Sequence, residues 1–180
     1  MLASDKARPS RIVVLGCSGS GKSTLASALA EKLGLPFRPT DEVQWRPDWA
    51  PAPPDDVREW LERETCQRSW VLDGNFDAHR DLVWGRAEMA VWLDPRWATT
   101  VFRVLRRNLH WWITRIPVWG GPRMTLPRAI SGVGHAARSH GAKRRSYPEA
   151  LLEFPRLHVV RIRSNTALKA WLDSLGPSDS

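Results

Sequence analysis

The stretch GCSGSGKST, residues 16–24, decides the fold, because it places a lysine and a hydroxyl side chain directly after a glycine-rich turn. It reads Gly16, four further residues, and then Gly21-Lys22-Ser23. The run before it, residues 11–15, is apolar and β-branched as in a buried strand, and residues 22–33 carry apolar side chains at helical spacing. A strand, such a loop and a helix in succession let backbone N–H groups and the helix N-terminus face a phosphate. The stretch therefore predicts a Walker A phosphate-binding loop.

Each part of this loop has an expected role toward ATP and Mg²⁺. Lys22 would reach the β- and γ-phosphates, and the Ser23 hydroxyl would bind Mg²⁺. The alternative is a plain glycine-rich turn, which does not explain a lysine and a hydroxyl in register. The residues expected to hold the nucleotide phosphates are Gly16, Ser18, Gly19, Ser20, Gly21, Lys22, Ser23 and Thr24.

Strand and helix patterns alternate along the rest of the chain. Further strands are expected over 37–40, 69–75, 90–94 and 157–162. Helices are expected from Asp55 or Asp56, from Asp94-Pro95, over 135–153, and from Ser164 or Asn165. A loop with four prolines covers 46–54, and a Gly/Pro-rich break covers 116–134. The helix after Asp94 carries one apolar stripe, made of Val101, Leu105, Leu109, Trp112 and Ile116. Alternation of this kind predicts an α/β fold with a parallel sheet covered by helices on both faces.

Polar residues stand where two of the expected strands end. Asp41 follows the second strand, and Asp73-Gly74-Asn75 ends the third. Ligands of parallel sheets bind beyond the carboxyl ends of the strands, so these residues should meet the glycine loop there. We favour Asp73 over Asp94 as the carboxylate that serves Mg²⁺, because Asp94 has an expected role as a helix N-cap. Asp41 is interpreted as a general base or hydrogen-bond acceptor for the substrate hydroxyl, with a turn-forming aspartate as the alternative.

The positive charge of the chain is concentrated in one segment. The net charge is +8, and residues 95–148 hold eleven Lys or Arg and no Asp or Glu. Arg103 and Arg107 are four residues apart and so project from one helical face, where guanidinium groups suit phosphate oxygens. Lys143-Arg144-Arg145 would form a second arm. Two interpretations of the segment stay open: a phosphate-binding lid that closes over the site, or a surface that attracts nucleic acid.

Several classes of protein are disfavoured by what the sequence lacks. It has no long apolar run and no apolar stretch near its start, so we expect no membrane attachment and a cytoplasmic protein. Its two cysteines make no disulfide framework. An Asn-Lys-x-Asp guanine-binding motif and a transporter Leu-Ser-Gly-Gly-Gln signature are both missing. A short chain with an arginine-rich middle segment favours a small-molecule kinase.

Four stretches carry a family resemblance. They are VVLGCSGSGKSTLASALAEKLGLPF, TDEVQWRPDW, WVLDGNFDAHRDLVWGRAE and AVWLDPRWATTVFRVLRRNL. Together they resemble the adenylate-kinase-like P-loop proteins that are labelled DNA topology modulation proteins. The resemblance implies a three-layer P-loop kinase fold with strand order 2-3-1-4-5. It also implies Mg²⁺ association for Asp73, substrate binding for Arg80, and a position at the start of a lid for Arg103 and Arg107.

The chain departs from adenylate kinases in the segment that would be the lid. Neither an ordinary lid nor a zinc-type cysteine cluster is present over 116–134, and the arm that would bind a nucleoside monophosphate is short and proline-rich. The acceptor is therefore not expected to be AMP bound in the ordinary way.

These observations combine into one hypothesis, an ATP- and Mg²⁺-dependent kinase for a small acceptor, as a monomer or homodimer. We expect one domain over 10–176 with a lid-like insertion over 112–146, and flexible tails at 1–9 and 177–180. The alternative is an NTP-binding protein or NTPase associated with nucleic acid, whose contacts would be nonspecific. Lys22, Asp41, Arg103 and Arg107 are the expected catalytic residues, and Ser164 is expected near the adenine. The residues expected to bind the acceptor are Asp41, Trp45, Asn75, Arg80 and Arg145.

Overall fold

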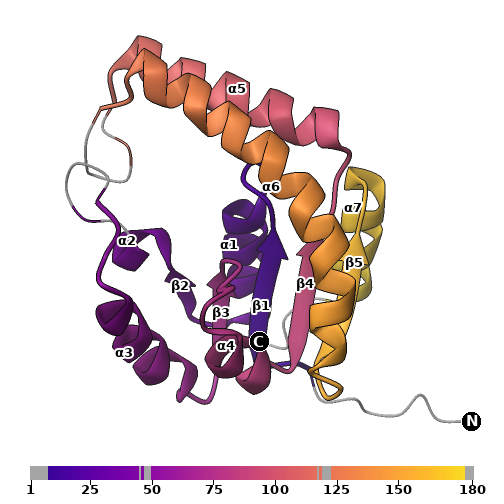
Figure 1. Ribbon diagram of the computed structural model, residues 1–180. Helices are drawn as coiled ribbons and strands as arrows, with labels where there is room; N and C mark the ends of the chain where they lie inside the picture. The colour runs from indigo at the N-terminus through magenta and orange to yellow at the C-terminus, as the bar shows by residue number, and fades with distance from the viewer. Residues whose placement is uncertain (1–7, 45, 47–49, 117, 119–122, 177–180) are drawn as a thin grey trace, which may run out of the picture.

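Five parallel strands form one sheet at the centre of the protein. The computed structural model describes residues 8–44, 46, 50–116, 118 and 123–176. In these residues the strand order is β2-β3-β1-β4-β5, which confirms the predicted order (Figure 1). The strands are β1 (Arg11–Gly16), β2 (Phe37–Pro39), β3 (Trp70–Asp73), β4 (Met89–Leu93) and β5 (His158–Ile162).

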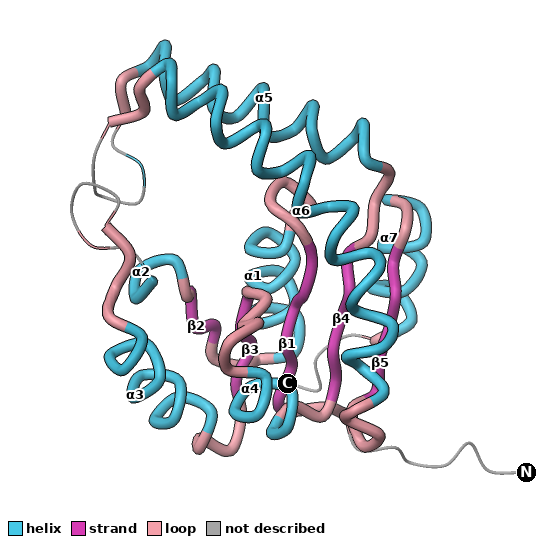
Figure 2. Tube along the Cα trace, in the orientation of Figure 1, coloured by secondary structure: helices cyan, strands magenta, loops and turns pink. Residues whose placement is uncertain are grey.

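Helices cover both faces of this sheet. The described helices are α1 (Lys22–Leu33), α2 (Asp41–Gln44), α3 (Pro54–Thr65), α4 (Arg80–Arg86), α5 (Trp97–Thr114), α6 (Leu126–Leu152) and α7 (Asn165–Ser174). Alternate residues of β1 enter opposite cores: Val14 packs with α1 and α7, whereas Val13 packs with α3, α4 and the end of α6. The result is the predicted three-layer α/β arrangement (Figure 2).

Two long helices extend past the carboxyl ends of the strands. Helices α5 and α6 run side by side in opposite directions, and we call them the α5–α6 arm, residues 97–152 (Figures 1 and 2). The last turns of α6 return to the sheet, where Tyr147 is fully buried against Trp84 and Trp92. None of the described helices has the length and apolar character needed to span a membrane.

The arm is more helical than the sequence indicates. The break expected over 116–134 ends early, because α6 begins at Leu126 with Thr125 as its N-cap and a proline in its first turn. Gly132, inside α6, allows this helix to pack closely on α5. A Cβ at Gly132 would lie 2.8 Å from Nδ2 of Asn108, and that same amide nitrogen donates to the carbonyl oxygen of Ala129 at 3.1 Å.

The apolar stripe of α5 is not its buried face. Thr100, Val104 and Asn108 are buried, whereas Leu105 and Leu109 are exposed. The sequence pattern marks the helix correctly, but the buried positions are those that pack on the glycine loop and on α6.

Two expected helix starts are also wrong. Helix α5 begins at Trp97 with Arg96 as its N-cap, because the backbone N–H of Asp94 continues the sheet by donating to Ile162. Helix α3 begins at Pro54, so Asp55 and Asp56 lie in its first turn rather than at the cap. The predicted cap of α7 is confirmed, since the Ser164 hydroxyl accepts from the N–H of Ala167 at 3.1 Å.

Candidate phosphate-binding site

The glycine loop between β1 and α1 is fixed by contacts that leave no room for larger residues. Gly19 has φ +79°, and a Cβ there would lie 2.6 Å from Cγ2 of Val104 and 2.8 Å from the carbonyl oxygen of Thr100. Gly16 has φ +149°, and a Cβ there would lie 2.7 Å from the carbonyl oxygen of Leu93. Only glycine combines these backbone angles with such close neighbours. The loop is therefore clamped between the end of β4 and the first turns of α5.

Two polar side chains of the loop region, Lys22 and Ser20, lie at the loop itself. Nζ of Lys22 donates to the carbonyl oxygen of Cys17 at 3.1 Å, so the ammonium lies over the loop that it follows. The Ser20 hydroxyl is buried and, within the described residues, its oxygen has no hydrogen-bond partner. Burial raises the pKa of the Cys17 thiol, which keeps it neutral. A cradle of small residues, an ammonium and an unpaired hydroxyl suits the oxygens of a phosphate chain.

Both predicted arginines of α5 reach the loop. Nη1 of Arg103 donates to the carbonyl oxygen of Ser20 at 3.3 Å, and its Nη2 donates to Oδ1 of Asn165 at 3.2 Å. Nη2 of Arg107 donates to the Ser18 hydroxyl at 3.4 Å, and its guanidinium stacks over Trp111. The two guanidinium groups thus contact the same loop at two positions, Ser20 and Ser18. Their positions follow from the packing of Val104, between them on the helix, against Gly19.

The ends of β2 and β3 meet beside the loop, as the sequence predicts. Asp73 is buried, and its Oδ1 accepts from the backbone N–H of Thr40 at 3.4 Å. The Thr40 hydroxyl donates to the Asp73 carbonyl oxygen. Oδ1 of Asn75 accepts from the backbone N–H of Gly16 at 3.1 Å, so this amide fixes the strand end to the loop. Ser23 stands exposed in the first turn of α1, and its predicted role toward Mg²⁺ with Asp73 stays a prediction.

A pocket lies beside α1, next to the glycine loop. Its volume is about 340 Å³, and it is lined by loop, α1, α5 and β5–α7 residues, among them Gly21, Thr24, Arg103, Arg163, Ser164 and Leu168. Ser164 lines this pocket and its hydroxyl caps α7, and its predicted place near the adenine stays a prediction.

The Asp94 side chain forms ion pairs with arginines and does not cap a helix N-terminus. Its carboxylate is buried, and Oδ2 accepts from Nη2 and Nε of Arg161 at 2.6 and 3.0 Å. Arg144 and Arg163 approach the same oxygen at 3.6 and 3.7 Å. Asp94 is therefore neutralised by its neighbours, which is a further reason to favour Asp73 for a cation.

The residues expected to bind the acceptor are dispersed. Arg80 pairs with Asp77 at 2.9 Å and stacks over Trp84, and Arg145 is exposed on α6 with its guanidinium beside Gly141. Asp41 begins α2 instead of ending a strand, and its side chain lies outside the described residues, as does Trp45.

The sequence analysis did not predict a charged cluster formed by Lys143, Asp77 and Arg80. Nζ of Lys143 on α6 donates to Oδ2 of Asp77 at 2.7 Å and contacts the hydroxyl of Tyr147 at 3.1 Å. Burial raises the pKa of Asp77, but hydrogen bonds from Lys143 and Arg80 outweigh it, so the pKa lies below its ordinary value. Asp77 lies four residues after Asp73, close to the predicted site residues in the sequence. Its partner Lys143, however, is 66 residues away. No local pattern indicates such a pair.

Comparisons with known proteins bear on the fold. No family model and no curated protein sequence matches the chain. Among solved structures, it is similar to a sugar kinase from Janibacter sp., with 19% identity over 93% of this chain and 95% of that one and a TM-score of 0.52. It is also similar to a gluconokinase from Sinorhizobium meliloti, with 21% identity over 93% and 95% of the two chains and a TM-score of 0.48. The chain thus has the P-loop kinase fold, and the expected membership of the DNA topology modulation family is not confirmed.

Proposed function

We propose that the chain transfers the terminal phosphoryl group of ATP to a small-molecule acceptor with the help of Mg²⁺. The observation that carries this proposal is the pair of arginines on α5, which contact the glycine loop at Ser20 and Ser18. Phosphoryl transfer depends mainly on positioning and on neutralising charge, and these are what fixed guanidinium groups beside a phosphate cradle supply.

The loop and the neighbouring pocket suit ATP. The pocket beside α1 continues from the loop at Ser20 and Gly21, so a bound nucleotide would place its base near Ser164 and its phosphates on the loop. Lys22 would exchange its contact with Cys17 for the β- and γ-phosphates. The buried Ser20 hydroxyl would gain a hydrogen-bond acceptor.

The donor set at the strand ends suits Mg²⁺. Ser23 offers a hydroxyl, and Asp73 offers a carboxylate that the Thr40 N–H holds in place. Bound there, Mg²⁺ would neutralise phosphate oxygens. Among the residues that the structure describes, no group of three His, Cys, Asp or Glu side chains could hold a metal. We expect phosphate oxygens to complete the ligands of Mg²⁺ beside Ser23 and Asp73.

The arm supplies what a kinase needs besides a nucleotide site. Arg103 and Arg107 would neutralise the moving phosphoryl group, and the rest of the arm would cover the site so that water does not take the acceptor's place. We expect the side chains of Asp41 and Asn75 to orient the acceptor.

The test is ADP formation from Mg-ATP across a panel of nucleosides, nucleotides and small alcohols. We expect one acceptor class to raise ADP release many-fold, Lys22→Ala to abolish the effect, and Lys32→Ala, in the last turn of the same helix, to leave it intact. The second candidate function, NTP binding linked to nucleic acid, is favoured by the absence of carboxylates over 95–148. Stimulation by plasmid DNA or RNA alone, with binding that weakens steeply with salt, would favour that candidate and contradict a kinase.

A further inference from the structure

The exposed apolar surface of the protein is concentrated on the α5–α6 arm. Every large apolar side chain that is exposed in the described residues lies within 97–152. Phe102, Ile113 and Ile130 are 64%, 65% and 65% exposed. They belong to two rows, which we call the outer face of the arm: Phe102, Leu105, Leu109 and Ile113 on α5, with Leu126 and Ile130 on α6.

The contact between the two helices shows that both rows lie on the same side of the arm. Nδ2 of Asn108 donates to the carbonyl oxygen of Ala129, so these two residues mark where α5 and α6 face each other. Leu109 and Ile130 each follow one of them in the sequence. In an antiparallel pair of helices, the residues that follow the contact turn to the same side of the pair. The two rows therefore form one face.

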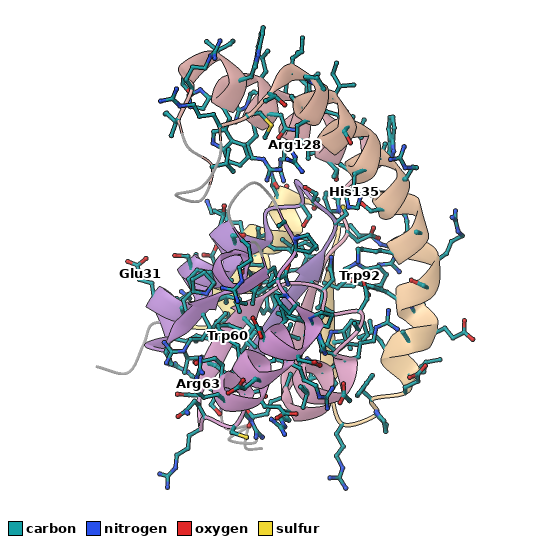
Figure 3. The ribbon with its side chains drawn as sticks, turned by 60° about the vertical axis from the view of Figure 1, so that its left-hand side comes forward. Glu31, Trp60, Arg63, Trp92, Arg128 and His135 are labelled. Carbon is teal, nitrogen blue, oxygen red and sulfur yellow. The ribbon has the colours of Figure 1, made fainter. Side chains whose placement is uncertain are left out.

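This face points away from the candidate site. Arg107 precedes Asn108 and contacts the glycine loop. Arg128 precedes Ala129, and Figure 3 shows it with His135 on the side of α6 that faces the body of the protein. The residues before and after the contact lie about 200° apart around each helix. The outer face is therefore turned to solvent, opposite the side that meets the loop.

A stripe of this kind is typical of a docking surface. Its members on α5 are three or four residues apart and continue over about three turns of the helix. Soluble proteins rarely leave a contiguous apolar patch uncovered unless it meets a partner or a membrane.

Charge indicates which kind of partner fits. Residues 95–148 hold eleven Lys or Arg and no Asp or Glu. Arg106 is exposed four residues after Phe102, so it stands at the edge of the α5 row. Like Arg115 and Arg123, it forms no ion pair with another described residue. Two such arms would repel each other, which disfavours a second copy of the chain, and an anionic surface that accepts apolar side chains is complementary.

We propose that the outer face of the arm binds the surface of an anionic lipid bilayer. The apolar rows would enter the boundary between headgroups and acyl chains, and the exposed arginines would contact lipid phosphates. The expectation of no membrane attachment rests on the lack of a long apolar run, which a helix that lies in the plane of the interface does not need. The inference goes beyond the proposed function and does not depend on it, because the glycine loop is on the other side of α5.

The test is co-sedimentation of the full chain with vesicles. One set contains phosphatidylcholine alone, and the other contains about 30% phosphatidylglycerol, which supplies the negative charge. We expect the partition coefficient for the anionic vesicles to be higher by about tenfold or more and to fall as salt is added. Absence of binding to the anionic vesicles, or equal binding to both sets, would overturn the proposal.

Variants of the outer face locate the binding. The double variant Phe102→Gln/Ile113→Gln should lower the partition coefficient about tenfold or more, because two apolar side chains no longer enter the bilayer. The matched control is Leu152→Gln, since Leu152 is 79% exposed but ends α6 at the sheet end of the arm. All the replaced side chains are exposed, so the melting temperatures should stay close to that of the unmodified protein. Vesicle binding that is unchanged in the double variant would show attraction by charge alone and would overturn the assigned face.

Two further measurements address other occupants of the face. Sedimentation velocity without lipid should give a monomer at concentrations where vesicles are bound. A dimer that the double variant dissociates would assign the face to a second copy and overturn the proposal. Polyglutamate tests for an acidic protein partner. If it competes fully with the vesicles, and its own binding is lost in the double variant, the lipid assignment is wrong.

Discussion

The glycine loop and the α5–α6 arm serve one site but are built in opposite ways. The loop is a short segment rich in small residues, and a Cβ at Gly16 or Gly19 would clash with atoms of β4 or α5. The arm consists of two helices of 18 and 27 residues whose long cationic side chains reach the loop or its surroundings. The loop therefore provides a fixed backbone geometry, and the arm provides positively charged side chains that extend toward it.

The largest expected effect concerns charge from the arm. Arg107→Ala should keep affinity for ATP and lower turnover by about 10²-fold or more, because a positioned cation acts mainly in the transition state. Steady-state kinetics and nucleotide titration would measure the two quantities. Arg106→Ala, one position away on the same helix, serves as the control and should change neither. If Arg107→Ala weakens affinity and turnover equally, the side chain binds ATP without favouring the transition state.

The contrast between the two regions also explains what the sequence could predict. The strand before the loop, the helix after it and the Ser164 cap follow from patterns within a few residues, where local chemistry determines the structure, whereas the strand order followed from the family resemblance. The start of α6 was not predictable, because Gly132 packs against Asn108, more than 20 residues away. The role of Asp94 was misread for the same reason, since its partner Arg161 lies on a distant strand.

A second prediction tests the fixed geometry of the loop. Gly19→Ala should lower the free energy of unfolding by about 2 to 4 kcal/mol, because a Cβ would meet both Val104 and Thr100 and the backbone has φ +79°. Gly34→Ala is the matched control, since Gly34 has φ +65° but no atom within 4 Å of the added Cβ. Gly34→Ala should lower the free energy of unfolding only by the strain of an alanine at positive φ, about 1 to 2 kcal/mol. Equal losses in denaturant titrations would mean that the loop is not packed on α5.

A third prediction separates the two faces of α5. Val104→Ala should cost about 1 to 3 kcal/mol of stability, because Val104 is 1% exposed. Leu105→Ala should cost about 0.5 kcal/mol or less, although leucine is the larger residue, because Leu105 is 50% exposed. Denaturant unfolding of both variants measures this difference, and the reverse order would place the apolar stripe of the sequence in the core after all.

The smallest expected effect concerns the ion pair between Lys143 of the arm and Asp77. The pKa of Asp77 is below its ordinary value of 3.8 in the folded protein, so the unfolded chain takes up a proton first as the pH falls. The stabilisation from Asp77 is therefore present at neutral pH and is lost as the pH falls below that value. We expect Asp77→Asn to melt at a lower temperature than the unmodified protein at pH 7. The gap should narrow in acid, and a gap that is constant across this range would argue against the ion pair with Lys143.

The central claim is that the arm and the loop together direct a phosphoryl group to an acceptor rather than to water. The most direct measurement is the balance of products in one reaction, with ADP, inorganic phosphate and phosphorylated acceptor measured by phosphorus NMR. The account predicts that phosphorylated acceptor equals the ADP formed, with little inorganic phosphate. Inorganic phosphate equal to ADP, whatever acceptor is supplied, would show an NTPase and contradict the claim.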